Sequence, residues 1–215
     1  VLPVSVNASG EHALVTPNFE IRVGLNLIKG LSSAACARIE ATAPFEGVAD
    51  LARRADLSVA HVEALADAGA LDCFGIDRRQ ALWQAGIAAT EKEGMLPGLS
   101  AISAPALPGM TEIELLAADI SSTGVTHDKQ PMELIRAQLN DAGILTAAQL
   151  KTAPDGTRIK VAGIITHRQR PQTASGLTFF GMEDETGLIN VMVSPGLWQR
   201  HRVIARTSKA LIVRG

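Results

Sequence analysis

The C-terminal third of the chain holds cationic and aromatic residues whose types suit the binding of a nucleic acid. Cationic side chains neutralise phosphates, and an exposed aromatic ring stacks on a base with about 1 to 3 kcal/mol per base. Adjacent residues of a strand point to opposite faces, so one of Phe179 and Phe180 is expected in the core, and the sequence does not say which. The candidate contacts are Lys160, His167, Arg168, Arg170, Phe179, Phe180, Arg200 and Arg202.

A second candidate site lies near the N-terminus. The segment 21–40 predicts a short helix to Ile28, a tight turn, and a second helix with Ser32 or Ser33 as its N-cap. In a helix-hairpin-helix unit, such a turn points backbone N–H groups and the positive end of the second helix at a DNA phosphate. Two glycines are usual in that turn, and Ser32 replaces the second, which weakens the contact if the position needs a positive φ. An ordinary helical hairpin remains the alternative. The candidate contacts are Lys29, Gly30, Leu31 and Ser32.

Motifs for catalysis are absent from the sequence: it has no Gly-rich phosphate loop, no nucleophile elbow and no His-Glu-x-x-His. The acidic run 183–185 could hold Mg²⁺, but it lies where a turn between strands is expected, and we interpret it as a solvated turn. His127 has no second base or ligand near it, and we interpret it as a loop histidine with satisfied hydrogen bonds. We expect no catalytic residue, no metal ligand and no cofactor in this chain.

The C-terminal candidates all lie in segment 154–215, whose sequence predicts an antiparallel sheet. Three runs rich in β-branched and aromatic residues within 159–194 are separated by turn sequences. A helix-like stretch at 197–205 then leads to a further strand at 210–214. Three strands, a helix and a strand is the order of the oligonucleotide-binding (OB) fold, a five-stranded Greek-key barrel. Only four strands are found before Gly215, so the predicted barrel is truncated.

The region before this sheet is predicted to be helical. Two amphipathic helices at 45–55 and 58–68 resemble a second, degenerate hairpin. Asp77 opens a further helix through a capping box with Gln80. Trp83 is expected in the core stripe of that helix, and base stacking by Trp83 is the alternative.

The whole chain therefore predicts an α+β protein, in which a helical helix-hairpin-helix region precedes a truncated OB-fold β-barrel. Thr111 with Glu114, Pro131, and Thr146 with Gln149 predict three further helix starts. We expect five segments: the end of a preceding region at 1–20, tandem hairpins at 21–93, a linker rich in Pro, Gly and Ser at 94–110, a helical connector at 111–153, and the incomplete OB fold at 154–215.

Charge and cysteine content narrow the class of protein. From Lys151 on, ten Lys and Arg stand against four Asp and Glu, which gives +6, whereas the whole chain carries −2 and its first 150 residues therefore −8. A basic unit of this kind is typical of polyanion binding. Cys36 and Cys73 lack metal-ligand spacing, which indicates buried thiols in a reducing, cytoplasmic setting. Apolar runs are too short for a membrane span.

Several stretches together resemble one known family, the C-terminal part of a bacterial DNA polymerase III alpha subunit. The run His-Arg-Gln-Arg-Pro at 167–171 is similar to the error-prone, damage-inducible branch of that family. The resemblance covers nearly the whole chain and is weakest in the linker. The stretches that carry it are 21–31, 68–72, 77–83, 166–171 and 183–187.

The resemblance implies a segment of a DNA-directed DNA polymerase for translesion synthesis and damage-induced mutagenesis. In such proteins the catalytic carboxylates and their Mg²⁺ lie upstream of the position of Val1. The hairpins would hold duplex DNA, and the barrel would hold single-stranded DNA or a partner protein. No clamp-binding peptide is found near 94–110, which implies recruitment through accessory mutagenesis proteins and only indirect contact with the sliding clamp. The alternative is a stand-alone nucleic-acid-binding or adaptor protein whose OB barrel docks partner proteins.

Overall fold

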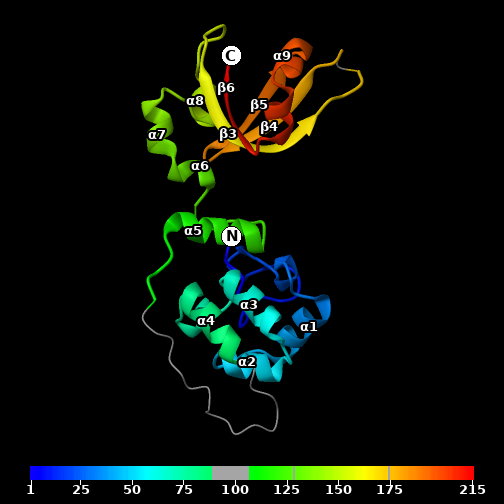
Figure 1. Ribbon diagram of the computed structural model, residues 1–215, viewed down its shortest axis with the longest axis vertical. Coiled ribbons are helices and arrows are strands. Elements are labelled where there is room, and N and C mark those ends of the chain that lie inside the picture. The colour runs from blue at the N-terminus through cyan, green and yellow to red at the C-terminus, as the bar shows by residue number, and fades with distance from the viewer. Residues whose placement is uncertain (89–106, 128, 174) are drawn as a thin grey trace. The chain divides into compact units, whose positions relative to one another are not determined.

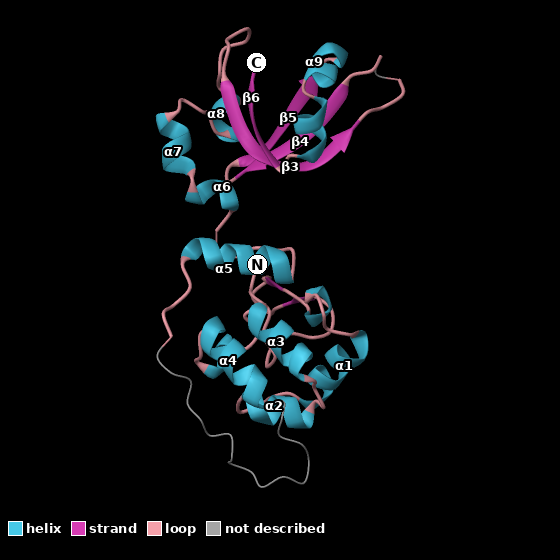
Figure 2. Ribbon diagram, viewed as in Figure 1, coloured by secondary structure: helices cyan, strands magenta, loops and turns pink. Residues whose placement is uncertain are grey.

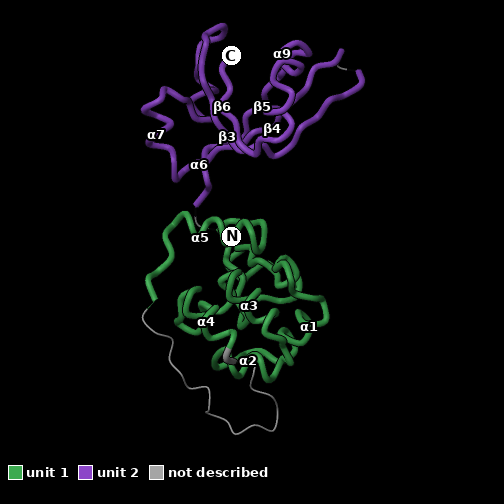
Figure 3. The backbone as a smooth tube through the Cα atoms, in the orientation of Figure 1, with its two compact units in different colours: residues 1–128 green, residues 129–215 purple. Residues whose placement is uncertain are grey.

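The computed structural model describes residues 1–88, 107–127, 129–173 and 175–215, which form two compact units, Val1–Asp128 and Lys129–Gly215 (Figure 3). Helices and antiparallel strands are both present, as the α+β prediction requires (Figure 2). The two units divide the predicted connector 111–153 between them. Most of the predicted linker, 94–106, lies outside the described residues.

The first unit is mainly helical, with one small two-stranded antiparallel sheet (Figure 1). Val4 and Val6 lie in the same hydrophobic core as the helices, so residues 1–20 pack as part of this unit. The elements are β1 (Leu14–Val15), β2 (Ile21–Arg22), the 3-10 turn η1 (Leu25–Leu27), α1 (Ser33–Thr42), α2 (Val48–Arg54), α3 (Val59–Asp67), the 3-10 turn η2 (Asp72–Phe74), α4 (Arg78–Ala88) and α5 (Glu112–Ser122).

Side-chain caps fix the helix starts of the first unit where the sequence predicts them. The Ser58 hydroxyl accepts from the backbone N–H of His61 at the start of α3. At α4 the carboxylate of Asp77 accepts from the N–H of Gln80, whose side chain accepts in return from the N–H of Asp77. Thr111 forms the same reciprocal box at the start of α5. Each cap contributes about 1 kcal/mol to helix stability. Trp83, expected in a core stripe, is only half-buried.

The predicted first helix of the hairpin, 21–28, is wrong over most of its length. Ile21 and Arg22 pair with Val15 and Leu14 as antiparallel strands, and only η1 is helical. The local sequence favours a helix, but the partner strand lies several residues upstream and its pairing decides the backbone conformation.

The second unit contains a four-stranded antiparallel sheet with the strand order β5-β4-β3-β6. The predicted order of three strands, a helical stretch and a strand is confirmed, although two short helices that meet at His201 replace the single predicted one. The elements are α6 (Pro131–Leu134), α7 (Arg136–Asp141), α8 (Ala147–Leu150), β3 (Lys160–Gln169), β4 (Thr178–Asp184), β5 (Gly187–Val193), α9 (Pro195–Arg200), α10 (Arg202–Thr207) and β6 (Ala210–Arg214).

One face of this sheet is the core of the second unit, where Phe180, Met182 and Ile189 are buried with Trp198 and Ala205 packed against them. We call the opposite side the outer face. It is covered only in part: Ala162 and Ile164 of β3 pack against a small cluster that contains Met132, Leu139 and Ile144. Elsewhere on this face Leu188, Met192 and Ile212 are exposed, whereas Phe179 is half-buried.

Candidate nucleic-acid interface

The hairpin turn of the first unit leads into the N-terminus of α1 as predicted. Ser32 is the N-cap, and its hydroxyl accepts from the backbone N–H of Ala35 at 3.2 Å. Gly30 has a φ of +89°, whereas Ser32 has a φ of −80°. Since the left-handed conformation falls on the glycine alone, serine at position 32 carries no backbone strain.

Other residues of this turn contact the protein itself. The backbone N–H of Lys29 donates to the carbonyl of Ser122 at 2.9 Å, and its ammonium donates to the carbonyl of Ser121 at 2.6 Å. Leu31 is half-buried against the core. Of the four predicted contacts, Gly30 and Ser32 are exposed residues, while Lys29 is engaged with the C-terminal end of α5.

A carboxylate also lies beside the N-terminus of α1. The hydroxyl of Ser33, the first residue of the helix, donates to the carboxylate of Glu11. A negative group is favourable near a helix N-terminus, where the backbone carries partial positive charge. Glu11 therefore supplies part of the negative charge that a phosphate would otherwise bring to this end of the helix.

A buried ion pair holds α5 against α4. The guanidinium of Arg78 donates to the carboxylate of Asp119, and both side chains are almost inaccessible to solvent. A side chain at Gly69 would stand 2.8 Å from that guanidinium, so the glycine leaves room for it. His127 Nδ1 lies 3.4 Å from the second carboxylate oxygen of Asp119, which agrees with a loop histidine that has a partner.

In the second unit, Phe180 is not available to a base, and its prediction as a DNA contact is wrong. Its ring is 2% exposed and meets Trp198 edge to face, with 6.1 Å between the ring centres. The guanidinium of Arg168 lies over the ring of Phe180, at 5.7 Å from its centre, and donates to the carbonyls of Ala205, at 2.8 Å, and Ser208. Arg168 therefore satisfies carbonyls at the end of α10.

Phe179 lies on the outer face, half-buried, between its cross-strand partners Gln169 and Met192. Met192 is 70% exposed, so the surface around the ring is open and apolar. His167 belongs to the same face, because the register of β3 and β4 sets it opposite Gly181 after a bulge, and the missing side chain of Gly181 makes room for the imidazole. The outer face thus brings together Phe179 and His167 of the predicted set.

The remaining predicted cations of the second unit are all exposed. Arg170 follows β3, Arg200 ends α9 and Arg202 begins α10. Lys160 begins β3, at the opposite end of that strand from Gln169, the partner of Phe179.

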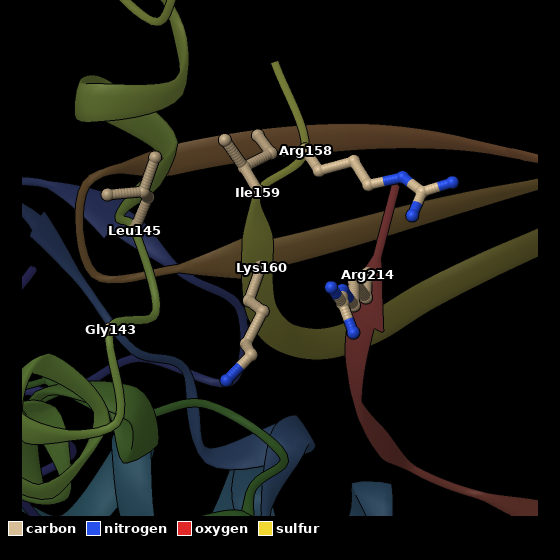
Figure 4. A pocket seen from close by; sticks show the side chains of 6 residues that line it. All are labelled: Gly143, Leu145, Arg158, Ile159, Lys160 and Arg214. Atoms are coloured by element: carbon tan, nitrogen blue, oxygen red, sulfur yellow. The ribbon is translucent and has the colours of Figure 1, made fainter.

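Two cationic residues that the sequence reasoning missed lie beside Lys160. Arg158 and Arg214 line a pocket of about 360 Å³ together with Lys160, Gly143, Leu145 and Ile159 (Figure 4). The spacing of Arg158 and Lys160 was the available sequence signal, since residues two apart in a strand share a face. The position of Arg214 depends on strand register, which that signal does not contain.

The interpretation of 183–185 as a solvated turn is wrong for Asp184, whose side chain is buried. One carboxylate oxygen accepts from the backbone N–H of Ala147 at 2.7 Å. The other accepts from the N–H groups of Thr186 and Gly187, at 2.8 and 3.1 Å. These contacts tie the start of α8 to the turn between β4 and β5.

Arg136 pairs with two of the three acids of the run 183–185. Its guanidinium donates to both carboxylate oxygens of Glu185 and, at 3.3 Å, to Asp184. The hydrogen bond with Glu185 is the main cause that raises the pKa of Arg136. Within the described ranges, no three His, Cys, Asp or Glu residues are grouped so that they could hold a metal ion.

The two cysteines differ in environment, which corrects the prediction that both are buried. Cys36 is buried in α1, and burial raises the pKa of its thiol. Cys73 lies in η2 and is exposed. Among the helices that the structure describes, none is long and apolar enough to cross a membrane.

Comparison with known proteins places the chain in a family. A family model for the helix-hairpin-helix motif matches residues 1–81. Over its full length, the chain is 66% identical to an error-prone DNA polymerase of Corynebacterium glutamicum and 63% identical to one of Corynebacterium efficiens. An error-prone DNA polymerase of Mycobacterium tuberculosis is 49% identical over 98% of the chain. The chain spans 20% of the length of each of these relatives. It therefore belongs, as a segment, to the family of error-prone DNA polymerases.

Proposed function

We propose that this chain is the DNA-binding segment of a DNA-directed DNA polymerase that acts in translesion synthesis and damage-induced mutagenesis. The observation that carries the proposal is the identity of 66%, over the whole chain, to a protein named error-prone DNA polymerase. The exposed cations of the second unit and the hairpin of the first unit support DNA as the ligand.

The first unit binds duplex DNA in this proposal. Gly30 and Ser32, just before α1, are exposed, and the N–H groups of the first turn of α1 suit a phosphate oxygen because they lack partners within the helix. Such a contact positions a duplex without reading its sequence. Lys29 holds the turn against α5 through hydrogen bonds to the carbonyls of Ser121 and Ser122.

The second unit binds single-stranded DNA in this proposal, as an OB fold. Its strand order supports that fold, since β3 pairs with both β4 and β6, as the first strand of an OB barrel pairs with the second and the fourth. Phe179 stacks a base on the outer face, and Arg170, Arg200 and Arg202 neutralise phosphates.

Catalysis takes place outside this segment in the same proposal. Catalytic carboxylates and Mg²⁺ belong to an upstream region, where two metal ions would assist nucleotidyl transfer. The protein works in the cytoplasm, reaches the sliding clamp only indirectly, and is recruited by accessory mutagenesis proteins. An exposed apolar surface on α9 and α10 supports a protein partner: Leu197 is 43% exposed, Val203 74% and Ile204 53%.

Binding of the 215-residue chain to labelled single-stranded and primed duplex DNA across a salt series tests the proposal. Replacement of Arg170, Arg200 and Arg202 by Ala is expected to weaken single-strand binding and to flatten the slope of log affinity against log salt by about 2. A matched variant with Lys151, Arg206 and Lys209 changed to Ala controls for net charge. If the unchanged chain binds neither DNA at low salt, the proposal is overturned, and the adaptor function becomes the better account.

A further inference from the structure

The pocket at the start of β3 is lined by three cationic side chains. Arg158, Lys160 and Arg214 are all exposed, and no carboxylate belongs to its lining. Figure 4 shows Arg158 on the segment that enters β3, Lys160 at the start of β3 and Arg214 on the neighbouring end of β6, with Gly143 and Leu145 on the loop beside them. The Lys160 ammonium donates to the carbonyl of Ala142 at 3.3 Å, which leaves it further N–H groups for another acceptor.

Strand register fixes two of the three charges on one face. Lys160 is the direct cross-strand partner of Arg214, and the ladder continues through Ile159 and Gly215, which exchange two backbone hydrogen bonds of 2.8 and 3.1 Å. Arg158 lies two residues before the start of β3 and lines the same pocket as Lys160. Like charges directly opposite each other destabilise a sheet. A bound anion would remove that repulsion.

We propose that Arg158, Lys160 and Arg214 form a phosphate-binding subsite for the backbone of single-stranded DNA. This inference rests on the proposed binding of single strands by the second unit and adds to it Arg158 and Arg214, which are not among the sequence candidates. Lys160 and Gln169 are the two ends of β3, so at about 3.3 Å per residue the subsite lies some 30 Å along the strand from the base-stacking site at Phe179. Between the two sites Ala162 and Ile164 are covered by Met132, Leu139 and Ile144, so a strand that reached both sites would pass around this cluster.

Arginine and lysine suit a phosphate in different ways. The planar guanidinium groups of Arg158 and Arg214 can each donate two parallel hydrogen bonds to one phosphate, while the Lys160 ammonium acts as a point charge. The neighbours Gly143, Leu145 and Ile159 bring no side-chain hydrogen-bonding group into the pocket, so its side-chain donors are those of the three cations, which phosphate oxygens would occupy in this proposal. Binding there is accordingly expected to be independent of sequence.

The test compares the 215-residue chain with a variant that carries Arg158→Gln, Lys160→Gln and Arg214→Gln. The probe is a fluorescein-labelled oligo-dT, followed by anisotropy across a salt series. We expect at least about a tenfold loss of affinity at low salt and a salt slope flatter by about 2. The charge-matched control changes Lys151, Arg206 and Lys209 to Gln. Thermal unfolding checks the fold, and the pocket variant is expected to be at least as stable as the unchanged chain because charge repulsion is relieved.

Two further measurements fix the interpretation. A variant with Arg158→Lys and Arg214→Lys keeps all three charges and is expected to retain the salt slope. Inorganic pyrophosphate, added at constant ionic strength, tests a free anion as the ligand. If pyrophosphate binds this pocket while the triple Gln variant holds oligo-dT like the control, the pocket serves small anions and the inference is overturned.

The remaining outcomes separate this inference from the proposed function. If the unchanged chain binds oligo-dT and the pocket variant matches the charge control in affinity and slope, the phosphate subsite is wrong and single-strand binding stands. If the unchanged chain does not bind oligo-dT at low salt, both proposals fail.

Discussion

The ammonium of Lys29 donates to the backbone carbonyl of Ser121 at 2.6 Å and so joins the hairpin turn to the C-terminal end of α5. The backbone N–H of Lys29 donates to the neighbouring carbonyl of Ser122. The sequence predicts Lys29 as a DNA contact, yet its two donor groups face the end of a helix, where partial negative charge accumulates. The hairpin turn is therefore fixed to the C-terminal end of α5 by these two hydrogen bonds.

This relationship makes a prediction for Lys29→Met. Because the ammonium is engaged within the protein, its loss is expected to lower the free energy of unfolding of the first unit by about 1 kcal/mol. The salt slope of duplex binding is expected to stay unchanged. Urea unfolding and anisotropy with a labelled duplex measure the two quantities, with Lys151→Met as control. A slope that flattens by about 1 would show that Lys29 contacts a phosphate directly.

The ion pair between Arg78 and Asp119 is expected to be the most sensitive contact of the first unit. The two side chains are 6% and 11% exposed, so Asp119→Asn leaves a buried guanidinium without its counter-charge, at a cost of about 3 to 5 kcal/mol. The pair Arg79–Glu114 is a control, since its side chains are 34% and 45% exposed and Arg79→Gln should cost under about 1 kcal/mol. Equal shifts of the two urea midpoints would contradict this ranking.

Asp184 is expected to stabilise the second unit without a role in catalysis. Asp184→Asn replaces one acceptor oxygen by an amide nitrogen that faces N–H donors, and removes a negative charge beside Arg136. A loss of about 1 to 3 kcal/mol follows. Asp155→Asn, in an exposed turn, should stay within about 0.5 kcal/mol. Thermal unfolding measures the stability of both variants. An Asp184→Asn variant as stable as the unchanged chain would argue against the buried hydrogen-bond network of Asp184.

The two thiols are expected to react at different rates. Burial raises the pKa of the Cys36 thiol and shields it, so at mildly alkaline pH only Cys73 should react quickly with Ellman's reagent in the folded chain. Addition of denaturant should release the second thiol. Cys73→Ser should abolish the fast phase, and a fast phase that survives this change would show that Cys36 is accessible.

Local signals in the sequence were sufficient for the helix starts. The helix start at 58 and the caps at Asp77, Thr111 and Thr146 are confirmed, because each depends on residues within one turn of the helix. The three strands expected within 159–194 are also present, as β3, β4 and β5, because runs of β-branched and aromatic residues between turn sequences are a local signal.

Features that depend on distant partners could not be predicted in this way. Asp184 is buried because Arg136 and Ala147, far upstream in the chain, supply its donors. The pocket cations Lys160 and Arg214 meet only through the register of β3 and β6. Phe180 differs from Phe179 only in the face to which it points, and the packing of Trp198 decides which face is the core.

Single-strand binding by the outer face of the second unit is tested most directly with Phe179→Ala. Anisotropy of labelled oligo-dT across a salt series measures its affinity beside that of the unchanged chain. Loss of one stacked base is expected to cost about 1 to 3 kcal/mol of binding free energy. The salt slope should stay the same, since no phosphate contact is removed. An unchanged affinity, with the fold intact by thermal unfolding, would contradict the account, because the ring proposed to stack on a base would then not touch DNA.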